Sequence, residues 1–168
     1  MARALAHFEE SNVPIAVDTA SGGLTVHGVK WRNNYLAIAQ KRGITLQVWE
    51  EHNSFPGIGG KSAHARRIWL FQLQAGGKAF GVRSAELEGE DVRDVALTLG
   101  IPDQRRLDLD MLHSENVLHL QLLGVRNLPL ETNADGHVCF HAQVPKGSSN
   151  PPVTRGPGKY TGGPWKTG

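Results

Sequence analysis

The stretch RRIWLFQLQAGGKAFGV, residues 66–82, decides how the chain folds. Its first half alternates Ile68 and Leu70 with Trp69 and Phe71, so both faces of an extended strand would be apolar. A strand that is apolar on both faces belongs in the interior of a sheet. The segment AGGK that follows has the glycines of a two-residue turn, which predicts a β-hairpin into AFGV.

Two segments before this hairpin also alternate as strands do. They are GGLTVHGVKW, residues 22–31, and ITLQVW, residues 44–49. Between them, residues 32–43 carry apolar side chains at helical spacing and end in Lys-Arg-Gly, which predicts a helical turn or two. The glycine-containing stretch HNSFPGIGGKSAHA, residues 52–65, predicts a surface loop before the hairpin.

Two longer helices are predicted outside this region. Residues 2–11 have apolar side chains at helical spacing and end before Pro14, as a short N-terminal helix would. Residues 89–99 place four apolar side chains on one stripe, begin with two acidic residues and are followed by Gly100. We therefore expect the central helix of the fold at about 89–99.

The second half of the chain predicts further strands. Residues 104–112 alternate as an edge strand, and residues 117–144 predict a pair of antiparallel strands with a long connection. The fold class is therefore α+β, mainly β: a small antiparallel barrel or bent sheet with an N-terminal helix and one central helix. Residues 1–144 are expected to form a single globular β-rich domain, and residues 145–168 an extended basic tail rich in Gly and Pro.

Four large aromatic residues fall in the strand-rich part of the chain. Buried aromatic side chains commonly anchor the core of a small barrel, so we assign them to the core. They are Trp31, Tyr35, Trp49 and Trp69.

Composition limits the class of protein and its location. The chain of 168 residues has 20 Gly and 9 Pro, which favours short strands and turns over a helical bundle. Cys139 is the single cysteine, so an internal disulfide is excluded and a reducing compartment is favoured. No apolar run approaches the ~20 residues of a membrane span, and MARALAHFEES lacks the apolar core of a signal peptide. We expect no membrane partner and a location in the cytoplasm or within a virion.

Charge is distributed unevenly along the chain. Residues 137–168 contain four Lys and Arg and no acidic residue, a net charge of +4. Residues 1–136 hold 14 Lys and Arg against 16 Asp and Glu, a net charge of −2. A near-neutral body with a cationic tail is typical of a protein that binds a polyanion or an acidic protein surface. It is also typical of a tail that only improves solubility.

Two groups of side chains are the candidate contacts with such a partner. In the loop, glycines expose backbone amides beside basic residues, which suits contact with a nucleic-acid backbone. In the tail, two aromatic residues stand next to lysines, which suits stacking on bases or docking into a groove of a partner. The predicted contact residues are Lys61, His64, Arg66, Arg67, Lys146, Arg155, Lys159, Tyr160, Trp165 and Lys166. We expect nucleic acid or other protein subunits to bind the tail, and the protein to belong to an oligomer or larger complex.

The segment GIGGKS, residues 57–62, matches the end of a phosphate-binding P-loop. Phe55 stands where the first glycine of that pattern should be, and a strand rather than a long helix is predicted to follow. A P-loop needs that helix because its N-terminal amides bind the phosphates. The sequence therefore favours a basic surface loop here over a nucleotide site.

A strand near the end of the domain carries a candidate zinc site. His137, Cys139 and His141 are spaced at i, i+2 and i+4, so on a strand they share one face. With a further ligand such as His113 or His119 they could bind zinc. The same alternation also fits a half-buried strand with a lone buried thiol. No other cofactor is predicted, and the two interpretations stay open.

No catalytic residues are predicted from the carboxylates or from known nucleophile motifs. Asp108 and Asp110 alternate with leucines, and together with Asp103 they are interpreted as a solvated face rather than as convergent metal ligands. The patterns G-x-S-x-G and H-E-x-x-H are absent from the sequence.

The segment GGLTVHGVKWRNNYLAIAQKRGITLQVW, followed after the loop by RRIWLFQLQAGGKAFGVRSAEL, carries a spaced pattern of glycines and apolar residues. The pattern is made by Gly28, Trp31, Leu36, Gly43, Leu46, Val48, Ile68, Leu70, Gly77 and Ala85. With these positions, residues 22–85 resemble the small β-barrel that follows the catalytic core of Mu-type transposases. Residues 50–65 replace the D-P-x-D turn of that family, and we expect no recombinase core before the pattern. The resemblance implies a DNA-contacting accessory module and not a transposase.

From these observations we predict a non-enzymatic nucleic-acid-binding or assembly subunit of a mobile-element or phage-like system. One alternative is a structural subunit of a large particle, such as a phage or virus, whose tail threads into neighbouring subunits. A second alternative is a metal-dependent enzyme that uses the cluster of His137, Cys139 and His141.

Overall fold

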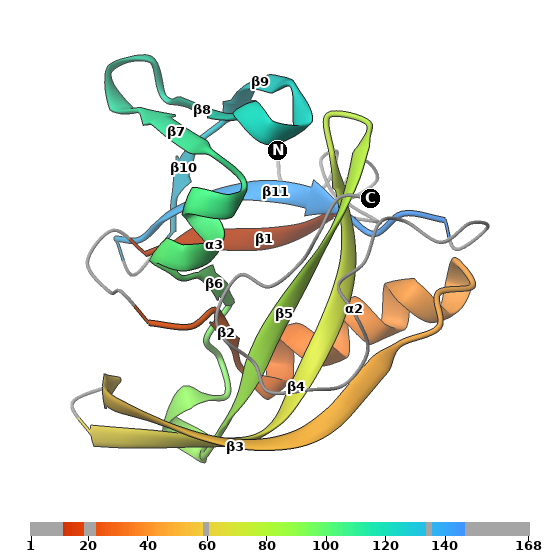
Figure 1. The fold of residues 1–168 in the computed structure, drawn as a ribbon, viewed down its shortest axis with the longest axis vertical. Coiled ribbons are helices and arrows are strands. Elements are labelled where there is room, and N and C mark those ends of the chain that lie inside the picture. The colour runs from red at the N-terminus through yellow and green to blue at the C-terminus, as the bar shows by residue number, and fades with distance from the viewer. Residues whose placement is uncertain (1–11, 19–22, 59–60, 134–135, 147–168) are drawn as a thin grey trace.

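The predicted hairpin is present, and the large sheet extends from both of its strands (Figure 1). It joins β4 (Lys61–Ala75) to β5 (Lys78–Glu88). The two turn residues, Gly76 and Gly77, have φ angles of +55° and +79°. A two-residue turn with positive φ at both positions matches the twist of the flanking strands. The prediction made from AGGK is therefore confirmed.

The structure is a computed structural model that describes residues 12–18, 23–58, 61–133 and 136–146, without the side chains at 56–58, 61 and 62. The predicted helix at 2–11 and the tail beyond Lys146 lie outside the described residues. The helices are α2 (Val29–Lys41) and α3 (Ile101–Arg106), with 3-10 helices at Glu90–Val92, His113–Glu115 and Gln121–Leu123. The remaining strands are β1 (Asn12–Val17), β2 (Val26–His27), β3 (Gln47–Ile58), β6 (Leu97–Leu99), β7 (Leu109–Leu112), β8 (Val117–Leu120), β9 (Val125–Pro129), β10 (Glu131–Thr132) and β11 (Val138–Gln143). Within the described ranges, no helix has the length and apolar character needed to cross a bilayer.

The fold is mainly β, as predicted, but its large sheet is mixed rather than purely antiparallel. The strand order is β10-β11-β1-β6-β2-β5-β4-β3, and the pairs β1–β6 and β2–β5 are parallel. Strand β11 also pairs with β4, with Gln143 opposite Gln74. This additional pairing joins two strands that are distant in the sheet order.

A separate three-stranded sheet of order β7-β8-β9 lies at one end of the molecule (Figure 1). The edge strand predicted at 104–112 is formed only by its last part, because α3 occupies residues up to Arg106. The predicted pairing within 117–144 is wrong. Strand β8 pairs with β7 and β9, whereas β11 pairs with β1 and β10 in the large sheet.

The central helix predicted at 89–99 does not form. A 3-10 helix covers Glu90–Val92, and Leu97 to Leu99 form β6 between β1 and β2. Leu97 and Leu99 are fully buried with Thr98 between them, which is the alternation of a strand. The apolar stripe was compatible with a helix, but pairing on both sides satisfies the backbone of these residues within the sheet.

Helix α2 is longer than predicted, and the strand before it is shorter. The expected strand at 22–31 contributes only the two residues of β2, because the helix begins at Val29. Trp31, Tyr35 and Ala39 are spaced at i, i+4 and i+8 and form its buried face. The helix therefore packs on the sheet through one aromatic side.

The predicted loop at 52–65 is instead the far end of the β3–β4 hairpin. Phe55 pairs with Ala63 across this hairpin, and both side chains are buried. They belong to a second apolar cluster that also contains Leu87 and Val92. The loop prediction was wrong because apolar residues in this glycine-containing segment face a core that only the folded hairpin creates.

The main core is built on Phe71, which is fully buried. Its ring meets those of Trp31 and Tyr35 edge-on, with centroids 4.9 and 4.8 Å apart. The hydroxyl of Tyr35 donates to the carbonyl of Gln72 (2.8 Å) and accepts from its amide (2.9 Å). Trp31, Tyr35 and Trp69 are buried as predicted, whereas Trp49 is only partly buried, against the second apolar cluster.

We predict that Gly28→Ala destabilises the protein by about 1–3 kcal/mol, the usual cost of overpacking. A Cβ at Gly28 would lie 2.5 Å from the carbonyl oxygens of Val92 and Arg93, which belong to the backbone. Its φ of −97° suits any residue, so the cost is steric. Urea unfolding would measure it. The control is Gly43→Asn, because Gly43 has a φ of +74° with open space around it and Asn tolerates that conformation. An equal loss in both variants would contradict the packing at Gly28.

Candidate functional site

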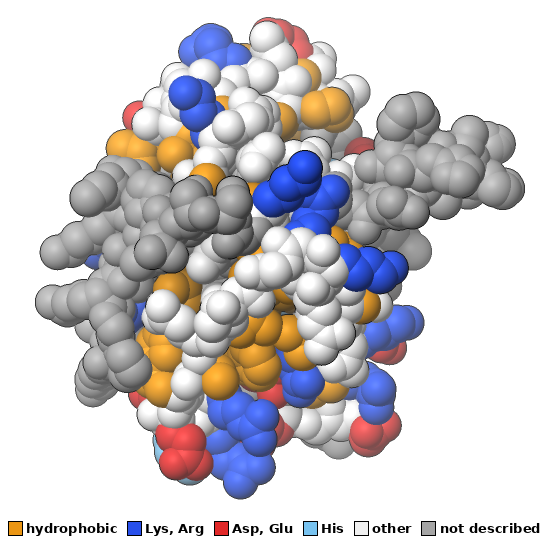
Figure 2. All heavy atoms as spheres, turned by 90° about the vertical axis from the view of Figure 1, so that its right-hand side faces the viewer, with side chains coloured by type: hydrophobic (Ala, Val, Ile, Leu, Met, Phe, Trp, Pro, Cys, Tyr) orange, Lys and Arg blue, Asp and Glu red, His pale blue; other side chains and the backbone are white. Residues whose placement is uncertain are grey.

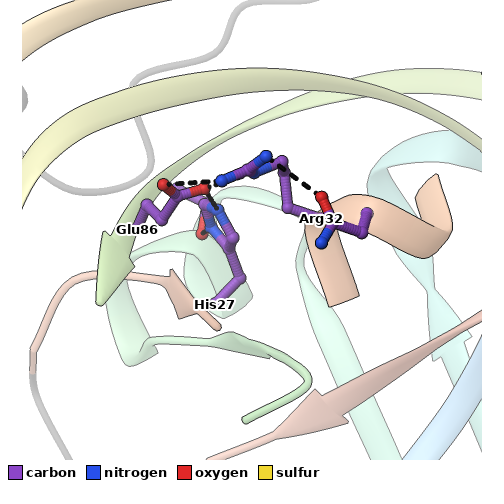
Figure 3. A network of polar contacts seen from close by, with 5 residues as sticks. His27, Arg32 and Glu86 are labelled. Atoms are coloured by element: carbon purple, nitrogen blue, oxygen red, sulfur yellow. Dashed lines mark hydrogen bonds and ion pairs between the residues drawn. The ribbon is translucent and has the colours of Figure 1, made fainter. Parts of the chain in front are cut away.

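A chain of buried polar groups joins β2, β5 and α2 (Figure 3). His27 of β2 is fully buried. Its Nδ1 lies 2.7 Å from the hydroxyl oxygen of Ser84, and its Nε2 lies 3.3 Å from Oε1 of Glu86. We call these three residues, together with Arg32, the β2–β5 network.

Arg32 completes the network from the first turn of α2. Its Nε donates to Oε1 of Glu86 at 2.7 Å, and its Nη2 donates to Oε2 at 3.2 Å. This two-point contact fixes the direction of both side chains. The guanidinium also lies over the ring of Trp69, 5.2 Å from its centroid, as in a cation–π contact. The start of α2 is thereby tied to β4 and β5.

The pKa shifts of His27 and Glu86 determine which members of the network are charged at neutral pH. Burial lowers the pKa of His27, and the hydrogen bond to Glu86 only partly opposes this effect. Burial alone would raise the pKa of Glu86, but hydrogen bonds from His27 and Arg32 outweigh it and lower that pKa to about 2. At neutral pH His27 is therefore neutral and Glu86 is ionised. His27 then donates through Nε2 to Glu86 and accepts at Nδ1 from Ser84.

The order Ser84, His27, Glu86 has the components of a nucleophile, a base and an orienting carboxylate. A nucleophile must also meet its substrate, and the side chains of Ser84 and His27 are both 0% exposed. The arrangement therefore serves to connect elements of the fold. Its chemistry is that of a buried ion pair extended by two neutral hydrogen-bonding groups.

A second buried polar contact lies at the other end of β2. The hydroxyl of Thr25 donates to Asp103 and accepts from the amide of Gly100 at 3.0 Å. Thr25 and Asp103 are fully buried. The interpretation of three solvated aspartates is therefore wrong for Asp103, because the first turn of α3 directs it toward β2. Asp108 and Asp110 are exposed, as that interpretation expected.

The predicted contact residues of the loop lie on the β3–β4 hairpin. His64, Arg66 and Arg67 are exposed on β4, while the side chain of Lys61 is not described. Arg66 forms an ion pair with Glu88 at 2.6 Å, and Arg67 lies opposite Glu50 on β3. Carboxylates from neighbouring strands therefore accompany these arginines, which reduces the positive field that the sequence suggested.

Of the predicted contacts in the tail, Lys146 is exposed at the last described position. It follows β11 close to the point where Gln143 pairs with Gln74. Arg155, Lys159, Tyr160, Trp165 and Lys166 lie outside the described residues.

The three candidate zinc ligands occupy different environments. His137 is exposed and precedes β11, whereas Cys139 is buried on the strand. Burial raises the pKa of the Cys139 thiol, and the charge of Glu131 raises it further. His141 places its Nδ1 3.0 Å from Oε2 of Glu131. Among the described residues, no group of three or more His, Cys, Asp and Glu side chains is placed to hold a metal ion.

Comparison of the chain with protein-family models, with curated proteins and with solved structures found no match. The resemblance to the barrel module of Mu-type transposases therefore stays a prediction. The β2–β5 network was not predicted from the sequence, because His27 and Glu86 are 59 positions apart and no motif joins them. The available signal was a His and a Glu within otherwise apolar strand segments.

We predict that Glu86→Gln lowers the free energy of unfolding at pH 7 by about 3–5 kcal/mol, since it leaves a buried partner uncompensated. The matched control is Arg66→Gln, which breaks an ion pair whose side chains are 58% and 41% exposed. An exposed pair contributes at most about 1 kcal/mol. Chemical denaturation of both variants measures the difference. Similar losses would contradict the structural role of the network.

We also predict that the wild-type protein loses stability as pH falls. The unfolded chain protonates His27 near its ordinary pKa of 6.5, whereas the folded protein resists protonation until lower pH, so acid favours unfolding. Protonation of Glu86 adds a second loss of stability between pH 4.5 and about 2, because its pKa is lower in the folded protein than in the unfolded chain. Denaturation curves at a series of pH values test this. The second loss should be absent in Glu86→Gln, and an equally steep acid loss in that variant would refute the assignment.

Proposed function

We propose that this protein is a non-enzymatic subunit that binds nucleic acid through its basic C-terminal segment, in a mobile-element or phage-like system. The observation that carries the proposal is the charge division of the chain, +4 over residues 137–168 and −2 over the rest. Polyphosphate backbones attract such a segment by releasing bound counterions. Tyr160 and Trp165 add stacking surfaces beside Lys159 and Lys166.

Exposed cations of the folded body support the same function. On the face seen in Figure 2, Lys and Arg side chains border an area of apolar side chains. Among the described residues, the exposed cations that make no ion pair are Lys41, Arg67, Lys78, Arg105, Arg106, Arg126 and Lys146. Phosphate contacts of this kind position a nucleic acid without reading its sequence. The complete burial of His27 and Ser84 supports a role without catalysis at that network.

The pairing of β11 with β4 bears on the predicted barrel. A barrel requires strands from the two ends of a sheet to meet, and Gln143 opposite Gln74 joins β11 to β4, each of which lies next to an end strand. We interpret the large sheet as a small barrel on this basis. A barrel would be in line with the DNA-contacting module that the transposase resemblance implies.

The expected result is binding to DNA or RNA that weakens steeply with salt. Each phosphate contact contributes a slope of about −0.9 for duplex DNA in a plot of log affinity against log salt. Deletion of residues 147–168 should reduce that slope by about 3, because it removes Arg155, Lys159 and Lys166. Fluorescence anisotropy with labelled single-stranded and duplex oligonucleotides measures both.

The matched control for this deletion is Lys30→Gln, which removes an exposed cation that lies 4.0 Å from Asp94 on the folded body. It should leave the salt slope nearly unchanged. Tyr160→Ala and Trp165→Ala should weaken binding to single strands more than to duplexes, because only unpaired bases stack freely. Binding that is absent, or independent of salt, would overturn the proposal.

A second candidate function is that of a structural subunit whose tail threads into neighbouring subunits of a large particle. The observation that favours it is that acidic residues offset the positive charge of the β3–β4 hairpin. Arg66 is paired with Glu88, and Glu50 and Glu51 lie on β3, the last strand of the sheet. This surface suits a cationic peptide better than a phosphate backbone. Sedimentation of nucleic-acid-free protein separates the candidates, because particle-sized assembly without nucleic acid would favour this one.

A further inference from the structure

Strand β3 presents a long edge with which no described segment pairs. It is the last strand in the order of the large sheet, and within the described ranges its partner is β4. It is twelve residues long, with register shifts between Glu50 and Asn53 and between Phe55 and Ile58, so stretches of backbone N–H and C=O groups lie on its outer side. Such an edge is a template for a further extended chain.

The edge is acidic next to an exposed apolar side chain. Glu50 is exposed and makes no ion pair among the described residues, although Arg67 lies opposite it on β4. Val48, two positions earlier on the same face of the strand, is 45% exposed. Glu51 adds a second carboxylate. Acidic residues here oppose the pairing of two β3 strands, because like charges facing each other across strands are destabilising. The same residues attract a strand that carries cations.

We propose that the β3 edge binds the C-terminal segment, residues 147–168, of a second copy of this chain. That segment carries Arg155, Lys159 and Lys166 and no acidic side chain, so its charge complements the edge. Its 22 residues span up to ~70 Å when extended, whereas a folded chain of this size has a radius of gyration of about 15 Å. The segment is therefore long enough to reach a neighbour. This inference rests on the second candidate function, assembly through the tail.

The first test is self-association of the full chain, treated with nuclease and studied at low salt by sedimentation equilibrium. The expected result is association that increases with concentration and with falling salt, and a monomer after deletion of residues 147–168. Glu50→Lys should weaken association about fivefold, since it replaces attraction by repulsion at an exposed site. The control is Glu115→Lys, the same charge change at an exposed position outside the large sheet, which should have no effect.

A charge exchange makes the test specific. The double substitution Arg155→Glu with Lys159→Glu should also weaken association when that variant is studied alone. A mixture of this variant with Glu50→Lys should associate again, because each tail then meets an edge of opposite charge. Hydrogen exchange should show protection of residues 47–58 in the mixture and in the wild type, and no such protection in the truncated chain.

Three results would overturn the inference. They are a monomeric full chain at all concentrations, equal effects of Glu50→Lys and Glu115→Lys, and association without protection of residues 47–58. Nucleic-acid binding is measured separately on the same proteins. Glu50→Lys should not weaken it, since the substitution removes a negative charge. Absence of tail-dependent nucleic-acid binding would therefore contradict the proposed function. Failure of the charge exchange would contradict only the proposal that the tail binds the β3 edge.

Discussion

Strand β2 is only two residues long, yet it connects the two halves of the large sheet, because it lies between β5 and β6. So short a strand makes few backbone hydrogen bonds, and the groups around it supply the rest. The carbonyl of Thr25 accepts from the amide of Ala85, and the amide of Gly28 donates to the carbonyl of Val95 at 2.7 Å. The side chains of Thr25 and His27 are tied to α3 and β5. Because buried polar groups must be paired, these contacts favour the observed arrangement of the two halves of the sheet.

Local signals in the sequence were sufficient for part of this fold. The glycine pair of the β4–β5 turn, the apolar strand before it and the aromatic core residues each follow from a few neighbouring positions. The parallel pairs and β6 do not. Residues 97–99 fit the stripe of a helix as well as a short strand, and the choice is made by β1 and β2, which are distant in sequence. Pairing between distant segments overrides local preference in such short elements.

The same limit applies to the polar residues. Arg66 appears in the sequence as a free cation, but the pairing of β4 with β5 places Glu88 beside it. Asp103 follows a proline in a polar stretch and is nevertheless fully buried. The hydroxyl of Thr25, just before β2, donates a hydrogen bond to its carboxylate. Neighbours that are distant in sequence determine whether a charged side chain is available to a binding partner or is already paired within the fold. The division of charge between body and C-terminal segment could be predicted, since it depends on composition alone.

The position of β1 has a consequence for how the protein is made. Ile15 pairs with Phe140 on one side and with Leu97 on the other, so the first described strand has one neighbour from late in the chain and one from its middle. During synthesis on the ribosome, β1 leaves the exit tunnel long before β11. Pairings between residues so distant in sequence form slowly, because a long loop must close before any contact compensates for its lost entropy. The apolar face of β1 therefore spends the period of translation without its final partners, when nascent chains are most prone to aggregate.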